Sequence, residues 1–174
     1  MSGSVNLGEL TFRDVTQALL PDIFSLNTLA FGSDAESRII GRLHKEGLSV
    51  CSLAAYDSNA LVGHILFSHL PTVVDGRDVK ALALAPMCVA PKFQKCGVGS
   101  ALVGEGLKRV KSAGYEAVVV VGHPNYYPRF GFSAATAAHL NGPFSGPAFM
   151  VLELVVGALS GTQGQVRYPA AFEI

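Results

Sequence analysis

A short basic loop that carries two glycines lies where an apolar segment meets a helical pattern. The loop covers residues 94–99 (Gln-Lys-Cys-Gly-Val-Gly), the apolar segment is 79–89, and the helical pattern covers 97–113. Backbone amides at the start of a helix have no partner inside the helix, and the helix dipole favours anions there. Gly97 and Gly99 lack a Cβ atom, so a phosphate can approach the backbone closely. The spacing therefore predicts a cradle for a pyrophosphate group.

Two common nucleotide-binding patterns do not fit this loop. The P-loop requires a Gly-x-x-x-x-Gly-Lys-Ser/Thr spacing, which the loop lacks. The dinucleotide pattern requires a third glycine where this chain has Leu102, and an acidic residue further on that binds the ribose. A nucleotide-binding protein is therefore the less favoured alternative. The loop could also be an ordinary glycine-rich turn from strand to helix, and the neighbouring residues decide between these interpretations.

The composition is that of a compact globular protein without a dominant charge. The chain has 174 residues, of which 49% are hydrophobic and 15% are charged. Its 13 Lys and Arg residues balance 13 Asp and Glu residues, so no overall field favours nucleic acid or an acidic membrane. We expect a single domain over residues 1–174 that binds neither, with an irregular segment at about 134–148.

The cysteines and the N-terminus indicate a reducing compartment. Cys51, Cys88 and Cys96 have no Cys-x-x-Cys spacing, which argues against a disulfide framework and a structural metal site. The first ten residues lack the basic and apolar regions of a signal peptide, and the apolar runs are too short to span a bilayer. We expect a cytoplasmic protein that binds no metal.

The apolar periodicity predicts a mixed α/β fold. Helical patterns and strand patterns alternate along the chain, the helices at 16–30, 34–45 and 97–113, and the strands at 9–14, 48–56, 61–70, 79–89, 116–121, 149–156 and 165–168. Gly32 is expected to end the first helix, and residues 75–78 are expected to form a turn. The strand–loop–helix–strand order over 79–121 is typical of a β-α-β crossover with two parallel strands. We expect a mostly antiparallel sheet with one parallel strand pair, flanked by helices.

Two motifs in the right order resemble those of the GCN5-related N-acetyltransferase (GNAT) superfamily. The first is the loop at 94–99, which follows a strand ending in Val-Ala-Pro at 89–91. The second is Tyr-Tyr-Pro-Arg-Phe-Gly-Phe at 126–132, and the stretch over 149–169 is similar to the YhbS-like bacterial branch. The resemblance covers roughly residue 9 to the C-terminus. It implies the GNAT-like acyl-CoA N-acyltransferase fold.

The resemblance also implies that acetyl-CoA is the co-substrate. In this family the loop amides hold the CoA pyrophosphate, and the pantetheine arm pairs with the edge of the preceding strand. That edge is exposed in the family because the strands at 79–89 and 116–121 splay apart. The cofactor-binding residues that the resemblance implies are Met87, Cys88, Val89, Gln94, Lys95, Cys96, Gly97, Val98, Gly99 and Ser100.

Acetyl transfer to an amine needs a proton for the departing thiolate and a polarised thioester carbonyl. By resemblance, Tyr127 is the general acid, and the backbone amides around 87–89 are the carbonyl donors. The alternative for Tyr127 is a packing tyrosine whose hydroxyl binds the backbone. The motif at 126–132 favours the general acid.

The general base is not fixed by the sequence. His64 is a weak candidate, with Glu36 and Asp34 as others and a chain of waters as an alternative route for the proton. A lone histidine in an apolar strand is more often a core residue. Cys88 is better explained as a buried inert thiol than as a nucleophile, because no neighbour in the sequence would lower its pKa.

The residues together predict an N-acetyltransferase that moves an acetyl group from acetyl-CoA to an amine by direct attack in a ternary complex. The acceptor is a small-molecule or peptide amine, and Phe31, Asp34 and Glu36 lie in the segment that lines the acceptor groove in this superfamily. A non-catalytic acyl-CoA-binding sensor with the same fold is the alternative. The acceptor, the acyl-chain preference and the oligomeric state, a homodimer included, stay open.

Overall fold

The computed structural model describes residues 4–174. The α-helices are α1 (Leu20–Phe31), α2 (Ala35–Lys45) and α3 (Val98–Ser112). The strands are β1 (Leu10–Asp14), β2 (Ser49–Asp57), β3 (Ala60–His69), β4 (Thr72–Val74), β5 (Arg77–Val79), β6 (Ala81–Val89), β7 (Ala117–Val121), β8 (Leu140–Asn141), β9 (Phe149–Glu153) and β10 (Gly164–Val166). The short 3₁₀ helices are η1 (Leu7–Glu9), η2 (Gln17–Leu19), η3 (Pro91–Phe93), η4 (Tyr127–Phe130) and η5 (Ala170–Phe172). Among these helices there is none with the length and apolarity that a membrane crossing requires.

The chain divides into two compact units. The first unit consists of the chain up to Phe67 together with Ala85–Lys108, and the second consists of Ser68–Leu84 together with Arg109–Ile174. The boundaries fall within β3, β6 and α3, so each of these elements contributes to both units. A single domain over residues 1–174 stays a prediction.

The strands confirm the mixed α/β fold that the sequence predicts. The larger sheet has the strand order β1-β2-β3-β6-β7-β9. Pairs β1–β2 and β7–β9 are antiparallel, and β6–β7 is the expected parallel pair, joined through α3. The parallel register joins Ala81 to Ala117, Leu82 to Val118 and Ala83 to Val119. Strand β6 continues past these residues to Val89.

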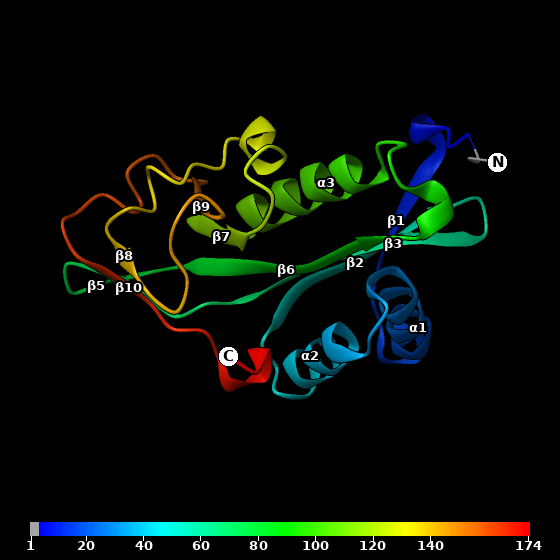
Figure 1. Ribbon diagram of the computed structural model, residues 1–174, viewed down its shortest axis with the longest axis horizontal. Helices are drawn as coiled ribbons and strands as arrows, with labels where there is room; N and C mark the ends of the chain where they lie inside the picture. Colours follow the sequence, from blue (N-terminus) through cyan, green and yellow to red (C-terminus); the bar gives the residue numbers. More distant parts are fainter. Residues whose placement is uncertain (1–3) are drawn as a thin grey trace. The chain divides into compact units, whose positions relative to one another are not determined.

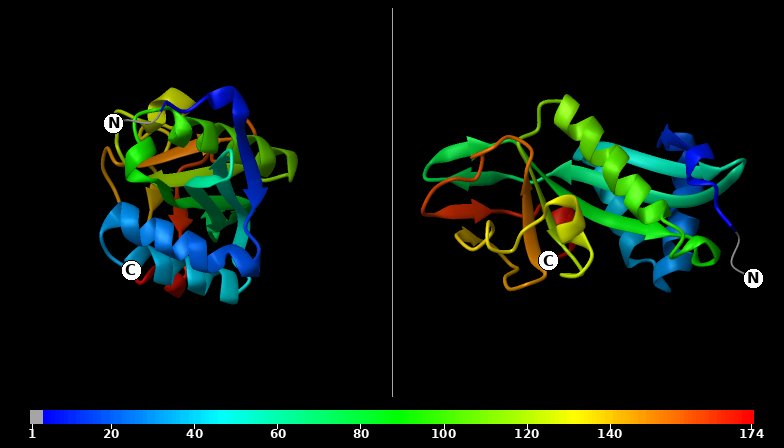
Figure 2. Two further views of the ribbon diagram at one scale, coloured as in Figure 1. Left: turned by 90° about the vertical axis from the view of Figure 1, so that its right-hand side faces the viewer. Right: turned by 90° about the horizontal axis from the view of Figure 1, so that it is seen from above.

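In the first unit, helices cover both faces of the sheet, as Figures 1 and 2 show, with α3 on one face and α1 and α2 on the other. Two glycines let α3 lie close to β3. A Cβ atom on Gly63 would lie 2.8 Å from Leu102 Cδ1 and 3.1 Å from the Cys88 carbonyl oxygen. A Cβ atom on Gly106 would overlap the ring of Phe67, a fully buried core residue. The position of α3 on the sheet therefore depends on both glycines.

The first helix begins later than the sequence predicts. The pattern at 16–30 divides into η2 (Gln17–Leu19) and α1 (Leu20–Phe31), because Pro21 occupies the first turn of α1. A proline there has no amide hydrogen to lose and fixes a helical φ, so it favours a helix start at this point. Gly32 ends α1, as predicted, in a left-handed conformation with φ of 76°, and its amide donates to the Thr28 carbonyl at 2.9 Å.

The long strand predicted at 79–89 is interrupted at Lys80. The Lys80 amide donates to the Glu116 carboxylate at 2.7 Å, and the Glu116 amide donates to the Lys80 carbonyl at 2.8 Å. Because both backbone groups of Lys80 are bound by one residue, the chain leaves the ladder between β5 and β6. The predicted turn at 75–78 is a tighter turn at Asp75 and Gly76, whose φ values are 47° and 79°.

The second unit contains a small sheet that the sequence did not predict, with the order β5-β4-β10-β8. It includes a second parallel pair, β10–β8, and β8 lies inside the segment at about 134–148 that was expected to be irregular. The strand predicted at 149–156 ends at Glu153 instead. The amides of Leu154 and Val155 both donate to the Glu116 carbonyl, which turns the chain.

The packing of α3 leads to a stability prediction with a matched control on the same helix. Gly106→Ala should lower the free energy of unfolding by about 1–3 kcal/mol, because the new methyl group overlaps the ring of buried Phe67. Gly104→Ala should raise it by about 0.5–1 kcal/mol, because a Cβ atom there meets nothing within 4 Å and alanine favours the helix. Urea denaturation measures both. Equal shifts for the two variants would contradict the close contact between α3 and β3.

Candidate functional site

The loop after β6 contains two residues in the left-handed conformation. It follows η3, and its residues Lys95 and Gly97 have positive φ values of 61° and 89°. The side-chain amide of Gln94 donates to the Val89 carbonyl at 3.1 Å, which ties the loop back to the end of β6. Helix α3 begins at Val98, directly after the loop. The predicted strand–loop–helix sequence is therefore confirmed.

The first turn of α3 provides backbone amides beside the loop. The amide of Ala101 donates to the Gly97 carbonyl at 3.0 Å. The amides of Val98, Gly99 and Ser100 therefore come before the first hydrogen-bonded turn. Amides in this position, together with the positive end of the helix dipole, attract an anion. This end of α3 can therefore hold a phosphate.

The N-terminal turn packs against this loop, a contact that the sequence did not reveal. A Cβ atom on Gly97 would lie 2.8 Å from Leu7 Cδ1. Leu7 belongs to η1, which is capped by the Asn6 side chain accepting from the Gly8 amide at 3.1 Å. Leu7 nevertheless remains 48% exposed. A single leucine near the start of the chain belongs to no periodic pattern or motif, so no sequence signal identifies it.

The end of β6 alternates between buried and half-buried residues. Met87 and Val89 are half-buried, whereas Cys88 between them is buried and packs with Leu26 and Ala90. The Ala90 amide donates to a carbonyl of β3 at 2.8 Å, so the strand end is held on the sheet. The side chains of Met87 and Val89 consequently lie on the more accessible face of the strand.

Cys88 has the properties of an inert thiol. Burial raises its pKa to about 12, the net result after a hydrogen bond with the His64 backbone lowers it and the negative charge of Glu36 adds a smaller rise. The thiol is therefore protonated at neutral pH, and a protonated thiol is a poor nucleophile. The effect of Glu36 also shows that its carboxylate lies within electrostatic reach of Cys88.

His64 is fully buried within a polar network between α1, β2 and β3. Its Nε2 atom lies 3.0 Å from Ser52 Oγ, and its Nδ1 atom lies 3.4 Å from Asn27 Nδ2. Asn27 also donates to the Ile23 carbonyl at 2.9 Å. Because the amide of Asn27 is the donor, Nδ1 of His64 accepts and Nε2 carries the proton. Burial lowers the pKa of His64 to about 3, with a smaller contribution from His44.

These features weigh against His64 as the base, although its role stays a prediction. Both ring nitrogens are engaged, the ring has 0% exposure, and the imidazole binds a proton only in acid. The sequence reading missed Asn27 and Ser52. Polar residues inside amphipathic segments give no signal of their partners, which come from different elements.

Tyr127 lies in the second unit, in an aromatic cluster at η4. Its ring is 5.1 Å from the ring of Tyr126 and 5.6 Å from that of Phe132, both in edge-to-face geometry. A Cβ atom on Gly122 would lie 2.4 Å from the Tyr127 ring, so this glycine provides the space for it. Burial raises the pKa of Tyr127 to about 12, with a smaller effect of Tyr126. The phenol therefore keeps its proton throughout the neutral range.

The connection between α1 and α2 carries the predicted acceptor-side residues. Phe31 is 44% exposed at the end of α1. Asp34 forms an ion pair with Arg38 on the surface of α2. Glu36 is half-buried, and its Oε2 atom lies 3.4 Å from Ser33 Oγ, which donates to it. The two carboxylates thus have different kinds of partner: Asp34 pairs with a cation, whereas Glu36 accepts a hydrogen bond from a hydroxyl group.

The first unit brings together the loop at 94–99, the strand end at 87–89, His64 and Glu36, whereas Tyr127 belongs to the second unit. Within residues 4–174, no group of three or more His, Cys, Asp or Glu side chains is arranged to hold a metal ion. The chemistry that these residues can support is anion binding at the start of α3 and proton transfer by carboxylate or phenol.

Comparison with known proteins identifies the family. The family model described as an acetyltransferase (GNAT) domain matches residues 11–135. YhbS of Escherichia coli K12, an uncharacterized N-acetyltransferase, is 36% identical over 155 residues, which is 87% of this chain and 92% of YhbS. Among solved structures, E. coli YhbS in complex with CoA has a TM-score of 0.85 at 34% identity, covering 95% of this chain and 93% of that chain. A GNAT acetyltransferase from Brucella melitensis in complex with acetyl-CoA has a TM-score of 0.77 at 28% identity, covering 94% and 97% of the two chains.

The mixed sheet, the glycine loop at the start of α3 and these matches show that the chain belongs to the GNAT family of N-acetyltransferases. Within that family it is similar to the YhbS branch over most of its length. The predicted family, fold and enzyme class are therefore confirmed. The individual site residues stay predictions.

The buried imidazole leads to a prediction for stability in acid. In the folded protein His64 stays neutral down to a pH of about 3, whereas the unfolded chain binds a proton below its usual pKa of 6.5. The unfolded state then holds more protons, so this contribution to stability is complete above pH 6.5 and is lost as the pH falls toward 3. The expected slope from this residue is about 1.4 kcal/mol per pH unit.

The test compares the wild type with His64→Gln by urea denaturation between pH 7 and pH 4. The variant should be less stable at pH 7 because its packing changes, and it should depend less steeply on pH than the wild type. His123→Gln, at an exposed histidine, is the matched control for loss of an imidazole. Parallel pH profiles for the wild type and His64→Gln would show that His64 is not the group responsible.

Proposed function

We propose that this protein transfers an acetyl group from acetyl-CoA to a small-molecule or peptide amine by direct attack in a ternary complex. The observation that carries the proposal is the cradle at the start of α3, where Gly97 is left-handed and three amides precede the first hydrogen-bonded turn. A pyrophosphate is the anionic group of CoA that suits such a site. The CoA and acetyl-CoA complexes of the two similar proteins support this choice of ligand.

The donor side of the site consists of the loop and the strand end before it. We assign the pyrophosphate to the amides of the loop, with Lys95 adding a positive charge, and the pantetheine arm to the backbone of the strand end. The Val89 carbonyl already accepts from Gln94, so the arm would use other backbone groups at 87–89. The assigned residues are Met87, Cys88, Val89, Gln94, Lys95, Cys96, Gly97, Val98, Gly99 and Ser100.

In the proposed reaction, the nitrogen of a neutral amine attacks the thioester carbonyl carbon, and the bond between this carbon and sulfur breaks. Tyr127 gives its hydroxyl proton to the departing thiolate and is reprotonated from solvent. The raised pKa of Tyr127, about 12, keeps the phenol protonated and so ready to donate. The products are the N-acetylated amine and CoA with a free thiol.

The amine must lose one proton, and we propose that this proton leaves through water or Glu36 rather than His64. Burial and two hydrogen bonds hold His64 neutral and enclosed. Glu36 is half-buried, and its charge acts on Cys88, the neighbour of Met87. A carboxylate in this position also favours a cationic amine as the acceptor, because the charges attract before the amine is deprotonated.

A thiol-release assay with acetyl-CoA and a panel of amines tests the proposed function. Release of CoA that depends on an amine, with acetylated product detected by mass spectrometry, supports the transferase. Isothermal titration in parallel measures acetyl-CoA binding. Tight binding without turnover on any amine would favour a non-catalytic acyl-CoA sensor. The absence of binding would overturn both the transferase and the sensor.

The loop leads to a prediction for cofactor affinity. Gly97→Ala should weaken acetyl-CoA binding at least about tenfold, because alanine disfavours a φ of 89° and its methyl group would meet Leu7. Gly47→Ala is the matched control, since Gly47 also has a positive φ, 71°, with nothing within 4 Å of its Cβ position. Both variants should lose stability, but only Gly97→Ala should lose affinity in isothermal titration. Unchanged affinity in Gly97→Ala would remove the loop from the donor site.

The general acid leads to a kinetic prediction. Tyr127→Phe keeps the ring within its aromatic cluster and removes the hydroxyl, so acetyl-CoA affinity should change little. The value of kcat should fall by roughly ten- to a thousand-fold, because the thiolate must leave without a proton donor. Tyr126→Phe is the neighbouring control and should retain most activity. An unchanged kcat at every pH would show that Tyr127 has a packing role only.

A further inference from the structure

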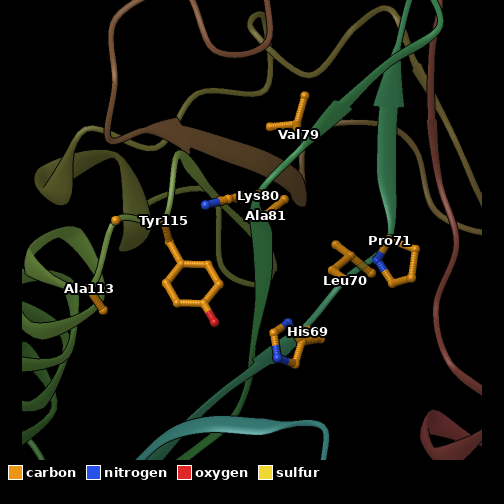
Figure 3. A pocket seen from close by; sticks show the side chains of 9 residues that line it. His69, Leu70, Pro71, Val79, Lys80, Ala81, Ala113 and Tyr115 are labelled. Carbon is orange, nitrogen blue, oxygen red and sulfur yellow. The ribbon is translucent and has the colours of Figure 1, made fainter.

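The second unit contains a pocket of about 330 Å³ where β3 ends and β6 begins. Residues 113–115, which connect α3 to β7, form its third side. Figure 3 shows the side chains around it, with the ring of Tyr115 between Lys80 and His69. Leu70, Pro71 and Val79 supply apolar surface. The pocket therefore has an apolar wall and a polar wall.

The polar wall consists of three hydrogen-bond donors without acceptors. The rings of His69 and Tyr115 are 5.9 Å apart, and the Tyr115 hydroxyl lies on the side of His69 in Figure 3. The Lys80 ammonium lines the same space. Within residues 4–174, these three polar ends have no hydrogen-bond or ion-pair partner, and none of the residues lining the pocket is acidic. Unpaired donors that line one pocket favour an anionic ligand.

Backbone hydrogen bonds hold this wall in place. Glu116 follows Tyr115 in the chain, but its carboxylate accepts from the Lys80 amide at 2.7 Å. Its own amide donates to the Lys80 carbonyl at 2.8 Å, and the Leu70 amide donates to the Ala81 carbonyl at 3.1 Å. Lys80 is thus anchored by its backbone, while its side chain extends into the pocket, as in Figure 3. The backbone of the polar wall is therefore fixed by hydrogen bonds within the protein.

This pocket is distinct from the cofactor loop. The loop follows the last residue of β6 and precedes the first residue of α3. The pocket is lined by Val79, Lys80 and Ala81 at the beginning of β6, and by Ala113 and Gly114 after the last residue of α3. The loop therefore belongs to the first unit and the pocket to the second.

We propose that the pocket binds a small organic anion, with its carboxylate or phosphate group held by Lys80, His69 and Tyr115 and a flat apolar part against Leu70, Pro71 and Val79. The volume of the pocket lies at the lower end of the range for ligand pockets, so the pocket suits a small metabolite. Lys80 supplies the charge, and the imidazole and phenol supply directed hydrogen bonds. The proposal does not depend on the proposed acetyl transfer.

Benzoate and phenyl phosphate are suitable probes, because they present the two anionic groups on the same flat ring. The full-length protein is titrated with each probe, and the ring-proton NMR signals of His69 are followed, with His69→Gln providing their assignment. We expect saturable shifts with at least one probe, and the comparison shows which group is preferred. Benzyl alcohol, which is neutral, should give none. Equal binding of benzyl alcohol, or no saturable shift with either anion at tens of millimolar, would overturn the proposal.

Lys80→Met tests the role of the charge while keeping the length of the side chain. This variant should bind the preferred probe at least about tenfold more weakly, and Tyr115→Phe should show a smaller loss. Lys45→Met, at an exposed lysine of α2, is the matched control and should bind as the wild type does. Saturating CoA should leave the His69 shifts unchanged. Competition by CoA, or an unchanged affinity in Lys80→Met, would locate the probe elsewhere and refute the site.

Discussion

The close approach of helix α3 to strand β3 is the constraint on which the first unit depends. Gly63 and Gly106 have no side chains at the two positions where β3 and α3 come nearest, and Phe67 and Leu102 fill the space beside them. This contact positions α3 on the sheet, and the start of α3 sets where the amides of its first turn lie. The amides that make an anion site are therefore held in place by packing one and two turns further along α3. This end of the helix can attract an anion through its amides and dipole without a charged side chain.

Desolvation keeps the reactive groups of this protein neutral. Burial lowers the pKa of His64 to about 3 and raises the pKa values of Cys88 and Tyr127 to about 12. Each group therefore has one protonation state across the neutral range: the imidazole is neutral, and the thiol and the phenol are protonated. The charged side chains that could respond to an amine lie instead at the surface between α1 and α2. The buried groups set a constant environment, and the variable chemistry is left to the more exposed carboxylates.

Sequence reading succeeded where a local rule decides the structure. The loop at 94–99, the helix end at Gly32 and the parallel pair β6–β7 follow from glycine position, apolar period and the crossover rule. The predictions failed where contacts between residues far apart in the sequence decide the structure. Strand β6 begins after Lys80 because Glu116 binds both backbone groups of that residue. In the small sheet, β10 overlaps the strand predicted at 165–168, whereas β4 and β8, of three and two residues, are too short to show a period. The partners of His64 and the contact of Leu7 with Gly97 depend on the folded chain in the same way.

The contact between Leu7 and Gly97 has a consequence for the order of folding during synthesis. The two residues belong to one compact unit, but Leu7 lies in its first segment and Gly97 in its second, which begins at Ala85. Because the ribosome delivers the N-terminus first, η1 has no surface to pack on until the loop after β6 has emerged. Closing so long a segment of chain costs entropy before the contact stabilises anything. Leu7 can therefore dock only after the loop that it contacts has been made.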